Sequence, residues 1–215
     1  MAKKFTHEIA YRGEGLIDRL KGVRIVVCGA GALGSNLVET LIRQGVSDIC
    51  VIDMDRVDEH NVNTQVYGDN DVGALKVTAL QNRIWRDVGV EIDVVNKKLE
   101  EKNVKKLLKG AKLVIDAFDN SEARQVLHDY CSKNKIDCLH SGLFEDYGEV
   151  VWDSVYQVPA NSEDGDVCDY PLARNIVMLV VTVVAEEVLD YVLSDNPRWK
   201  SWSVTLKDFA VRSYK

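Results

Sequence analysis

The glycine-rich turn GAGALG at residues 29–34 restricts the fold of this chain most strongly. It directly follows residues 23–28 (VRIVVC), which read as a buried strand, and the residues after it have the apolar spacing of a helix. In such a unit Gly29 permits the tight turn, Gly31 lets the backbone approach a phosphate, and Gly34 lets helix and strand pack closely. No lysine follows the last glycine, which excludes a Walker-type loop. The turn predicts a nucleotide site at a helix N-terminus; the alternative is a glycine turn that binds nothing.

Strands and helices alternate along the rest of the chain. β-Branched runs are typical of buried parallel strands, and the segments between them have helical spacing. The expected strands are 23–28, 49–53, 91–96, 113–117, 137–141 and 201–209, with an antiparallel segment within 150–158, and the expected helices are 35–43, 74–88, 101–109, 121–133 and 172–193. We therefore expect an α/β fold with a Rossmann-like, doubly wound, mostly parallel sheet and an antiparallel C-terminal part. A single domain over residues 1–215 is expected.

The charge balance argues against nucleic-acid and membrane-surface binding. The chain has 27 Lys and Arg against 34 Asp and Glu, a net charge of −7, whereas binding to these polyanions usually needs basic patches. Its longest apolar stretch, residues 176–184, is shorter than the ~20 residues that span a bilayer. We expect this stretch to be a helix buried in the core or at a subunit contact. The first residues lack the apolar run of a secretion signal, so we expect a cytoplasmic protein.

Five cysteines are present, and no two of them are spaced as C-x-x-C. A structural zinc is therefore not expected. Cys28 and Cys50 lie in expected strands and are expected to be core residues, as are Cys131 and Cys138. Cys168 lies in a polar loop, at residues 160–169, and is the one cysteine that the sequence places outside the core.

Polar motifs follow the expected strands in a fixed order. The second strand ends in D-M-D at residues 53–55, and an asparagine follows at position 61. The sequence G-A-L-K comes next at 73–76, and D-A-F-D-N at 116–120 ends another strand. A Tyr-Arg pair at 11–12 precedes the first strand. Each motif is weak alone, but their order and their positions at strand ends are specific.

This ordered set resembles the ThiF/MoeB/HesA family, the prokaryotic relatives of ubiquitin-activating enzymes, over residues 8–193. The resemblance implies adenylation of the C-terminal carboxylate of a small ubiquitin-like or sulfur-carrier protein with a Gly-Gly end. ATP and Mg²⁺ would be the cofactors, and pyrophosphate the product. It also implies a homodimer. We expect a single adenylation domain over residues 1–215, without an added ubiquitin-fold, rhodanese or catalytic-cysteine domain, so that any later transfer step would need a partner.

The same resemblance implies roles for the polar residues. Asp119 would hold Mg²⁺, and Asn120 would lie beside the nucleotide. Asp53 would bind the ribose, and Asp55 would support the turn or the metal shell. Lys76 would reach the phosphates as a flexible point charge. The plain alternatives are that Asp119 is a helix N-cap and that Lys76 is a solvated lysine.

Four further residues are candidates. Asn61 would contact phosphates, and Arg12 would reach the ATP of the partner subunit, with a surface residue as the alternative for Arg12. Cys168 occupies about the position where relatives place a thioester- or persulfide-forming cysteine, although its acidic neighbours disfavour the thiolate and an ordinary loop thiol is the alternative. His140 ends a strand at the carboxyl edge of the sheet. It either lines the site or is a packed histidine.

One position departs from the family pattern. In residues 60–65 (HNVNTQ), Thr64 stands where the family has an arginine. The change removes a phosphate ligand, and Arg56 or Arg124 would have to supply the charge. An alternative function therefore follows from Thr64: the chain would be a non-catalytic partner that binds nucleotide or a ubiquitin-like protein.

Two other enzyme classes share the glycine turn. A tRNA cyclic-adenosine dehydratase belongs to the same superfamily, but the acidic balance counts against it. An NAD-dependent dehydrogenase would need a substrate domain, for which little chain is left, and would leave Lys76 and Asp119 unexplained.

Overall fold

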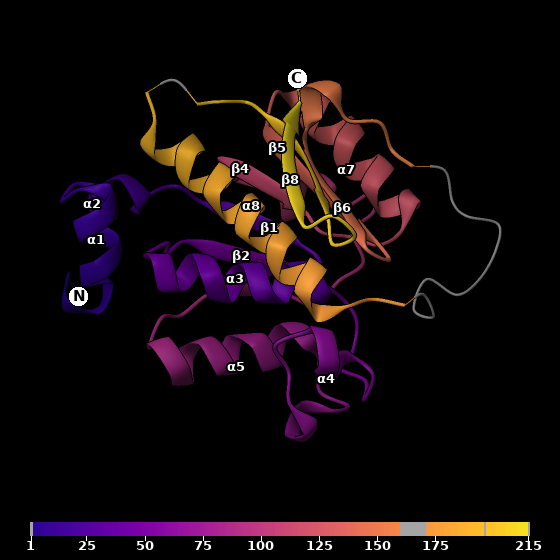
Figure 1. Ribbon diagram of the computed structural model, residues 1–215. Coiled ribbons are helices and arrows are strands. Elements are labelled where there is room, and N and C mark those ends of the chain that lie inside the picture. The colour runs from indigo at the N-terminus through magenta and orange to yellow at the C-terminus, as the bar shows by residue number, and fades with distance from the viewer. Residues whose placement is uncertain (1, 160–170, 196, 215) are drawn as a thin grey trace.

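The computed structural model describes residues 2–159, 171–195 and 197–214. They form an eight-stranded sheet in the order β3-β2-β1-β4-β5-β6-β7-β8 (Figure 1). In this order, neighbouring strands from β3 to β5 are parallel, and those from β5 to β8 are antiparallel. The expected α/β class, with a mostly parallel sheet and an antiparallel C-terminal part, is confirmed.

The elements agree with most of the expected ranges to within a few residues. The strands are β1 (Ile25–Cys28), β2 (Ile49–Ile52), β3 (Asp93–Val95), β4 (Leu113–Asp116), β5 (Asp137–Phe144), β6 (Tyr147–Trp152), β7 (Ser201–Thr205) and β8 (Ala210–Tyr214). The α-helices are α1 (Thr6–Arg12), α2 (Leu16–Leu20), α3 (Ala32–Gln44), α4 (Asn61–Thr64), α5 (Lys76–Val88), α6 (Val104–Leu107), α7 (Ser121–Asn134) and α8 (Arg174–Leu193). The 3₁₀ helices are η1 (Ala2–Phe5), η2 (Asp69–Asp71) and η3 (Asp153–Val155).

The central strands are buried on both faces because each face has its own core. In β1, Ile25 and Val27 belong to a larger apolar core, whereas Val26 and Cys28 belong to a smaller one. Helices α3, α5 and α8 contribute to the larger core, and α6 and α7 to the smaller one. Successive strand residues point to opposite faces, so two covered faces require an uninterrupted apolar run.

Helix α8 lies in the larger core, which decides between the two environments expected for the apolar stretch. It packs against α3 and against β5, β6 and β7 (Figure 1). Ile176, Val180, Val184 and Val188 are all fully buried, while Met178 on the outer side is exposed. Because α8 is apolar nearly all round, it fits a position between a sheet and another helix.

Strand β5 joins the two parts of the sheet. It pairs in parallel with β4 along residues 137–140 and antiparallel with β6 along residues 139–144. The expected last strand, 201–209, is wrong in extent, because the chain turns within it and forms the β7–β8 hairpin. Phe209 in this turn has a φ of 49°. No glycine lies there to indicate the turn, so the pattern reads as one continuous strand.

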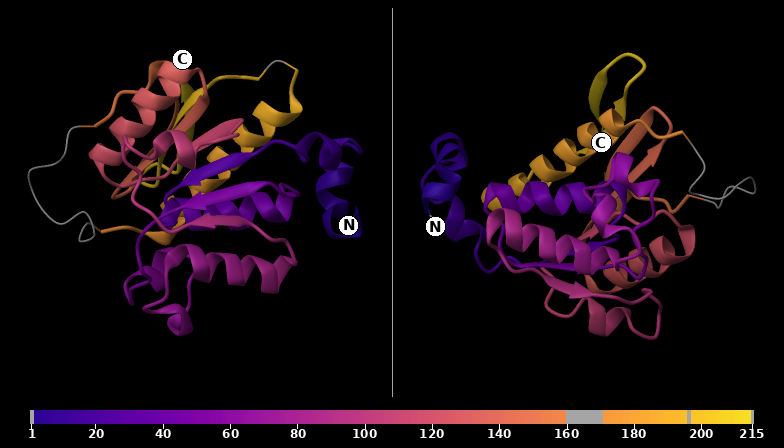
Figure 2. Two further views of the ribbon diagram at one scale, coloured as in Figure 1. Left: turned by 180° about the vertical axis from the view of Figure 1, so that it is seen from behind. Right: turned by 90° about the horizontal axis from the view of Figure 1, so that it is seen from below.

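The N-terminal helices α1 and α2 were not expected from the sequence. They lie at one end of the molecule, beside the C-terminal ends of α3 and α8 (Figure 2). Leu16 and Leu20 anchor them in the larger core. A Cβ on Gly45 would lie 2.6 Å from Cδ1 of Ile17. The contact is therefore close and fixes α2 against the end of α3.

Four cysteines are buried free thiols of the smaller core, as expected: Cys28, Cys50, Cys131 and Cys138. Burial raises the pKa of the Cys28 and Cys138 thiols, which makes them poor nucleophiles. Cys168 lies outside the described residues. In the part of the chain that the structure describes, no helix has both the length and the apolar character needed to cross a membrane.

Candidate nucleotide site

The glycine turn connects β1 to α3, and its glycines differ in the space around them: two are packed against backbone and one is not. Gly29 has a φ of 106° and donates its N–H to the Ile52 carbonyl at 2.8 Å. A Cβ on Gly29 would lie 2.6 Å from the Ala117 carbonyl oxygen, and one on Gly34 would lie 1.9 Å from the Gly29 carbonyl oxygen. A Cβ on Gly31 would meet no atom within 4 Å. The chain's own packing thus requires the first and third glycines, whereas the middle one borders open space at the N-terminus of α3.

Asp53 follows β2 and ties the glycine turn to the neighbouring loop. Its side chain accepts the Ala30 N–H at 2.6 Å and the Asp55 N–H at 2.7 Å, one on each carboxylate oxygen. Burial raises the pKa of Asp53, and the two N–H groups only partly offset this effect. The structure therefore shows Asp53 as a residue that shapes the turn, and its contact with a ribose remains a prediction.

Lys76 is a buried cation beside the D-M-D loop. It is the first residue of α5 and only 8% exposed. Its Nζ lies 3.3 Å from an Asp55 carboxylate oxygen, and its N–H donates to the Asp55 carbonyl at 2.9 Å. The alternative of a solvated lysine is wrong. Since the Asp55 side chain is half exposed, the ion pair lies at the surface of the loop.

Asp119 does not cap the N-terminus of α7. The N-cap of this helix is Asn120, whose side-chain oxygen accepts the Ala123 N–H at 2.9 Å. Asp119 is exposed, and the Asn120 side chain donates to it at 3.4 Å. The alternative of Asp119 as the N-cap is therefore wrong, and the carboxylate is available to a cation.

These segments meet at one edge of the sheet. Strand β1 lies between β2 and β4 and is parallel to both, so the glycine turn, Asp53 and Asp119 all follow carboxyl ends of neighbouring strands. The strand order reverses between β1 and β4, which is where nucleotides bind in sheets of this type. Helix N–H groups and the Lys76 ammonium suit phosphates, and the Asp119 carboxylate suits Mg²⁺.

The segment with the missing arginine forms the short helix α4. Asn61 is buried and accepts the Asp58 N–H at 2.9 Å, and Thr64 is buried as well. Arg174, the first residue of α8, donates to the carbonyl of Asn63 at 3.3 Å and to that of Gln65 at 3.4 Å. The guanidinium of Arg174 thus fastens α4 to α8.

The two arginines considered from the sequence are engaged elsewhere. Arg56 donates to the Gly73 carbonyl at 2.6 Å. Arg124 is buried and forms an ion pair with Asp116. Arg174 was missed because it lies 111 residues from Asn63 in the sequence, and only the fold brings the two together.

Arg12 does not belong to the site of its own chain. Its Nε lies 2.7 Å from Glu8, and the rest of its guanidinium pairs with Glu186 on α8. Burial lowers the pKa of Arg12, but the hydrogen bonds to Glu186 and Glu8 outweigh this and raise it. The N-terminal helices adjoin the C-terminal end of α3, whose 13 residues span about 20 Å from the glycine turn. The role of Arg12 in a partner's site remains a prediction.

A buried ionic network, which the sequence did not indicate, lies on the α7 face of the sheet. Asp116, the last residue of β4, accepts from His140 Nδ1 at 2.8 Å and from Arg124 at 3.4 Å. Burial raises the pKa of Asp116, but the Arg124 guanidinium and His140 reverse this and lower it. Arg124 also donates to the Ser141 carbonyl at 2.7 Å. His140 is therefore a packed histidine, one of its two expected environments.

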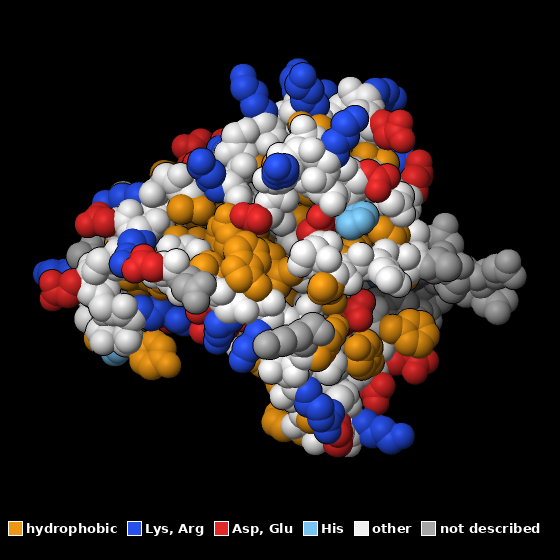
Figure 3. Space-filling model, turned by 90° about the horizontal axis from the view of Figure 1, so that it is seen from above, with side chains coloured by type: hydrophobic (Ala, Val, Ile, Leu, Met, Phe, Trp, Pro, Cys, Tyr) orange, Lys and Arg blue, Asp and Glu red, His pale blue; other side chains and the backbone are white. Residues whose placement is uncertain are grey.

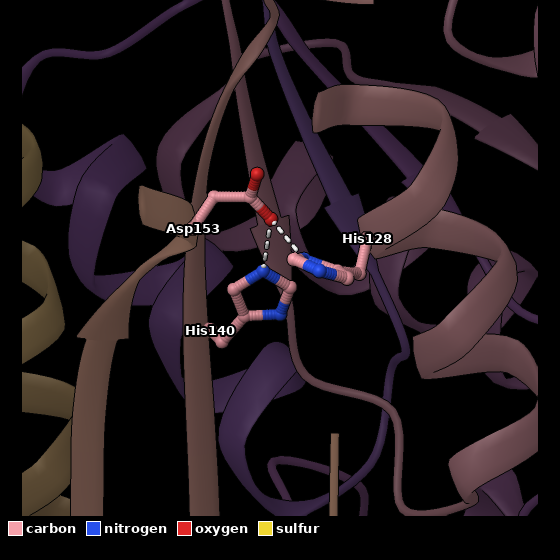
Figure 4. Close-up of side chains that lie close together, drawn as sticks. All are labelled: His128, His140 and Asp153. Carbon is pink, nitrogen blue, oxygen red and sulfur yellow. Dashed lines mark hydrogen bonds and ion pairs between the residues drawn. The ribbon is translucent and has the colours of Figure 1, made fainter. Parts of the chain in front are cut away.

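The network continues through Asp153 to the surface. One Asp153 carboxylate oxygen lies 2.9 Å from His140 Nε2 and 2.7 Å from His128 Nδ1 (Figure 4). The His140 ring stacks on Tyr156, with 3.6 Å between ring centres. Burial lowers the pKa of His140, whereas its bonds to Asp116 and Asp153 more than compensate and raise it. His128 carries no signal in the sequence, and it joins this group only through the fold.

Known proteins are similar to this chain in sequence and in fold. Residues 5–207 match the ThiF family. The SAMP-activating enzyme E1 of Haloferax volcanii is 34% identical over 66% of this chain and 52% of its own. The sulfur carrier protein ThiS adenylyltransferase of Bacillus subtilis is 33% identical over 60% of this chain and 40% of its own. The tRNA threonylcarbamoyladenosine dehydratase of Haemophilus influenzae is 32% identical over 59% and 49%.

A solved structure confirms the fold along the whole chain. Escherichia coli MccB with MccA-N7isoAsn has a TM-score of 0.84 at 14% identity and aligns with all of this chain and 72% of its own. The chain spans about half the length of the curated relatives it matches. Since the family match covers nearly the whole sequence, the chain belongs to the ThiF family.

Proposed function

We propose that this chain adenylates the C-terminal carboxylate of a small ubiquitin-like or sulfur-carrier protein with ATP and Mg²⁺ and releases pyrophosphate. The observation that carries the proposal is that the glycine turn and Asp119 lie at the edge where the strand order reverses, with Lys76 beside Asp53 and Asp55 at the end of the neighbouring strand. Two of the relatives described above are named for such activation, a SAMP-activating enzyme and a ThiS adenylyltransferase. We expect the protein to act in the cytoplasm.

The residues present fit ATP and Mg²⁺. The open space at Gly31 admits a phosphate to the N–H groups of α3, and the exposed Asp119 carboxylate would hold the metal. A bound Mg²⁺ would neutralise phosphate charge, which the attack of a carboxylate on phosphorus requires. Lys76 would move from Asp55 to the phosphates, and Asn61 and Asn120 would line the same edge. Asp53 would hold the turn in place while it contacts the ribose.

The surface charge favours a protein carrier over tRNA. The chain has a net charge of −7. Figure 3 shows a face on which basic and acidic side chains are mixed and apolar side chains gather near the centre. A tRNA would require a continuous basic surface. We therefore place dehydration of a tRNA nucleoside, the activity named for one relative, second to activation of a carrier.

Pyrophosphate exchange tests the proposal. The purified chain is incubated with ATP, Mg²⁺ and labelled pyrophosphate, with and without ubiquitin-like proteins of the same genome that end in Gly-Gly. We expect exchange that depends on one of these carriers and disappears when its last glycine is removed, since the attacking carboxylate is then displaced.

Other results of this assay would point elsewhere. ATP binding without exchange for any carrier would favour the non-catalytic partner that Thr64 allows. Exchange supported by tRNA alone would favour the dehydratase. Tight NADH binding without ATP binding would contradict the proposal.

We further propose that the active form is a homodimer in which Arg12 completes the partner's site. Arg12→Ala and Asp119→Ala homodimers should both be nearly inactive. A mixture of the two variants, after subunit exchange, should regain about a quarter of the wild-type rate, because half of the dimers then contain one intact site. The measurement is carrier-dependent exchange, with light scattering to establish the oligomeric state. No recovery in mixed dimers, or full activity of a monomer, would show that Arg12 does not act across an interface.

A further inference from the structure

The convergence of His128, His140 and Asp153 on the α7 face suggests a ligand other than nucleotide. The three residues come from three different elements, α7, β5 and η3. One ligand atom from each lies within 4.8 Å of the other two (Figure 4). Two imidazoles and a carboxylate are a preferred ligand set of Zn²⁺. From this juxtaposition we propose that the chain has a Zn²⁺ site formed by His128 Nδ1, His140 Nε2 and Asp153 Oδ1, none of which is among the residues proposed to bind nucleotide.

A bound ion would require shifts of all three ligand atoms, since His128 Nδ1 and His140 Nε2, which lie within 4.8 Å of each other, would have to be roughly 3.3 Å apart. Asp153 Oδ1 lies 2.7 Å from His128 Nδ1 and 2.9 Å from His140 Nε2. Ligands about 2.0–2.1 Å from a tetrahedral zinc lie roughly 3.3 Å from one another, so the two separations would open by about half an ångström. His128 is 23% exposed and Asp153 14% exposed, so an ion can reach them from solvent. Water would take the fourth position.

The surroundings of His140 are those of a supported zinc ligand. Its second nitrogen, Nδ1, faces the buried carboxylate of Asp116 at 2.8 Å. A carboxylate behind a ligating histidine fixes the tautomer and orients the ring toward the metal. Stacking on the Tyr156 ring also restrains the orientation of the His140 ring. His140 is therefore already oriented before an ion binds.

The charge balance favours a cation at this position. The network contains two carboxylates, those of Asp116 and Asp153, and one guanidinium, that of Arg124, which pairs with Asp116; one negative charge is therefore left if both imidazoles are neutral. A proton on His140 or a metal ion between the three ligands can balance it. The site uses no cysteine, so the lack of C-x-x-C pairs does not exclude it. The proposal departs from the sequence-based expectation of no structural zinc.

Metal content and thermal stability test the site without any activity assay. The untagged protein is stripped with EDTA, equilibrated with ZnCl₂ without nucleotide, passed through a desalting column and analysed by mass spectrometry. We expect one equivalent of zinc per chain and a rise in Tm of several degrees, since the ion links η3, α7 and β5. In His128→Ala and in Asp153→Asn, zinc affinity should fall at least tenfold and the rise in Tm should disappear.

Two controls separate this site from adventitious binding. The double variant His7→Ala/His60→Ala removes the other two of the four histidines and should retain one equivalent of zinc. Asp119→Ala removes the candidate Mg²⁺ ligand and should also retain it. Circular dichroism of His128→Ala, in which a partly exposed side chain is truncated, establishes that the fold is intact. The proposal is overturned if the wild type retains no zinc, or if His128→Ala and Asp153→Asn retain as much as the wild type.

Discussion

Replacement of Asp119 by alanine is expected to lower carrier-dependent pyrophosphate exchange roughly 10²- to 10³-fold, the usual cost of removing one preorganised electrostatic contact at a reacting centre. The reason is the position of the carboxylate. It follows β4 beside the glycine turn, it is exposed, and Asn120 rather than Asp119 caps α7. Its loss should therefore affect the metal and not the helix.

The Mg²⁺ dependence of pyrophosphate exchange distinguishes a loss of metal binding from damage to α7. Asp119→Asn should need a higher Mg²⁺ concentration for half-maximal exchange, because an amide oxygen is a weaker ligand for a hard cation than a carboxylate. Asp129→Ala, on the exposed side of the same helix, is the matched control and should exchange at the wild-type rate. An unchanged rate and Mg²⁺ dependence in Asp119→Ala would remove this residue from the site.

Gly34→Ala should unfold far more easily than Gly31→Ala, although the two substitutions add the same methyl group to one turn. At Gly34 the new Cβ would lie 1.9 Å from the Gly29 carbonyl oxygen, so α3 would have to move away from β1. We expect a loss of about 3 kcal/mol or more in the free energy of unfolding. At Gly31 the methyl group meets no atom within 4 Å, so stability should be nearly unchanged.

ATP binding by the correctly folded protein should show the opposite order, with Gly31→Ala more impaired than Gly34→Ala. Because the Gly31 methyl group would enter the space that a phosphate is proposed to occupy, Gly31→Ala should weaken ATP binding about tenfold or more. Urea unfolding and calorimetric ATP titration measure the two quantities. Wild-type ATP affinity in Gly31→Ala would place the phosphates elsewhere. A wild-type unfolding midpoint in Gly34→Ala would show that α3 can shift at little cost.

The sequence predicted the parallel part of the fold well because its signals are local. A glycine turn after a β-branched run and an apolar period in each helix are readable within a few residues, and they fix β1, β2, β4 and the helices between them. The β7–β8 turn was missed because Phe209 adopts a positive φ without a glycine or asparagine nearby. The N-terminal helices were missed because their contacts lie with the far end of α3.

The candidate site was predictable to the extent that its residues follow strands. Strand ends at one sheet edge converge whatever the details of packing, so Asp53 and Asp119 could be placed together in advance. The state of each side chain could not. Lys76, for example, is buried and paired with Asp55, and its position in the sequence does not reveal this contact. The ionic network around His140 joins residues from β4, α7, β5 and η3, and no spacing in the sequence reveals it.

The position of α8 also affects the order in which the chain can fold during synthesis. This helix, residues Arg174–Leu193, covers β5, β6 and β7 and packs on α3, which is made far earlier. Until α8 leaves the ribosome, the apolar face of α3 and of β5 and β6 stays open to solvent. Nascent chains that stop before residue 174 should therefore bind chaperones or aggregate, and folding can finish only after this late helix has packed on the early helix α3.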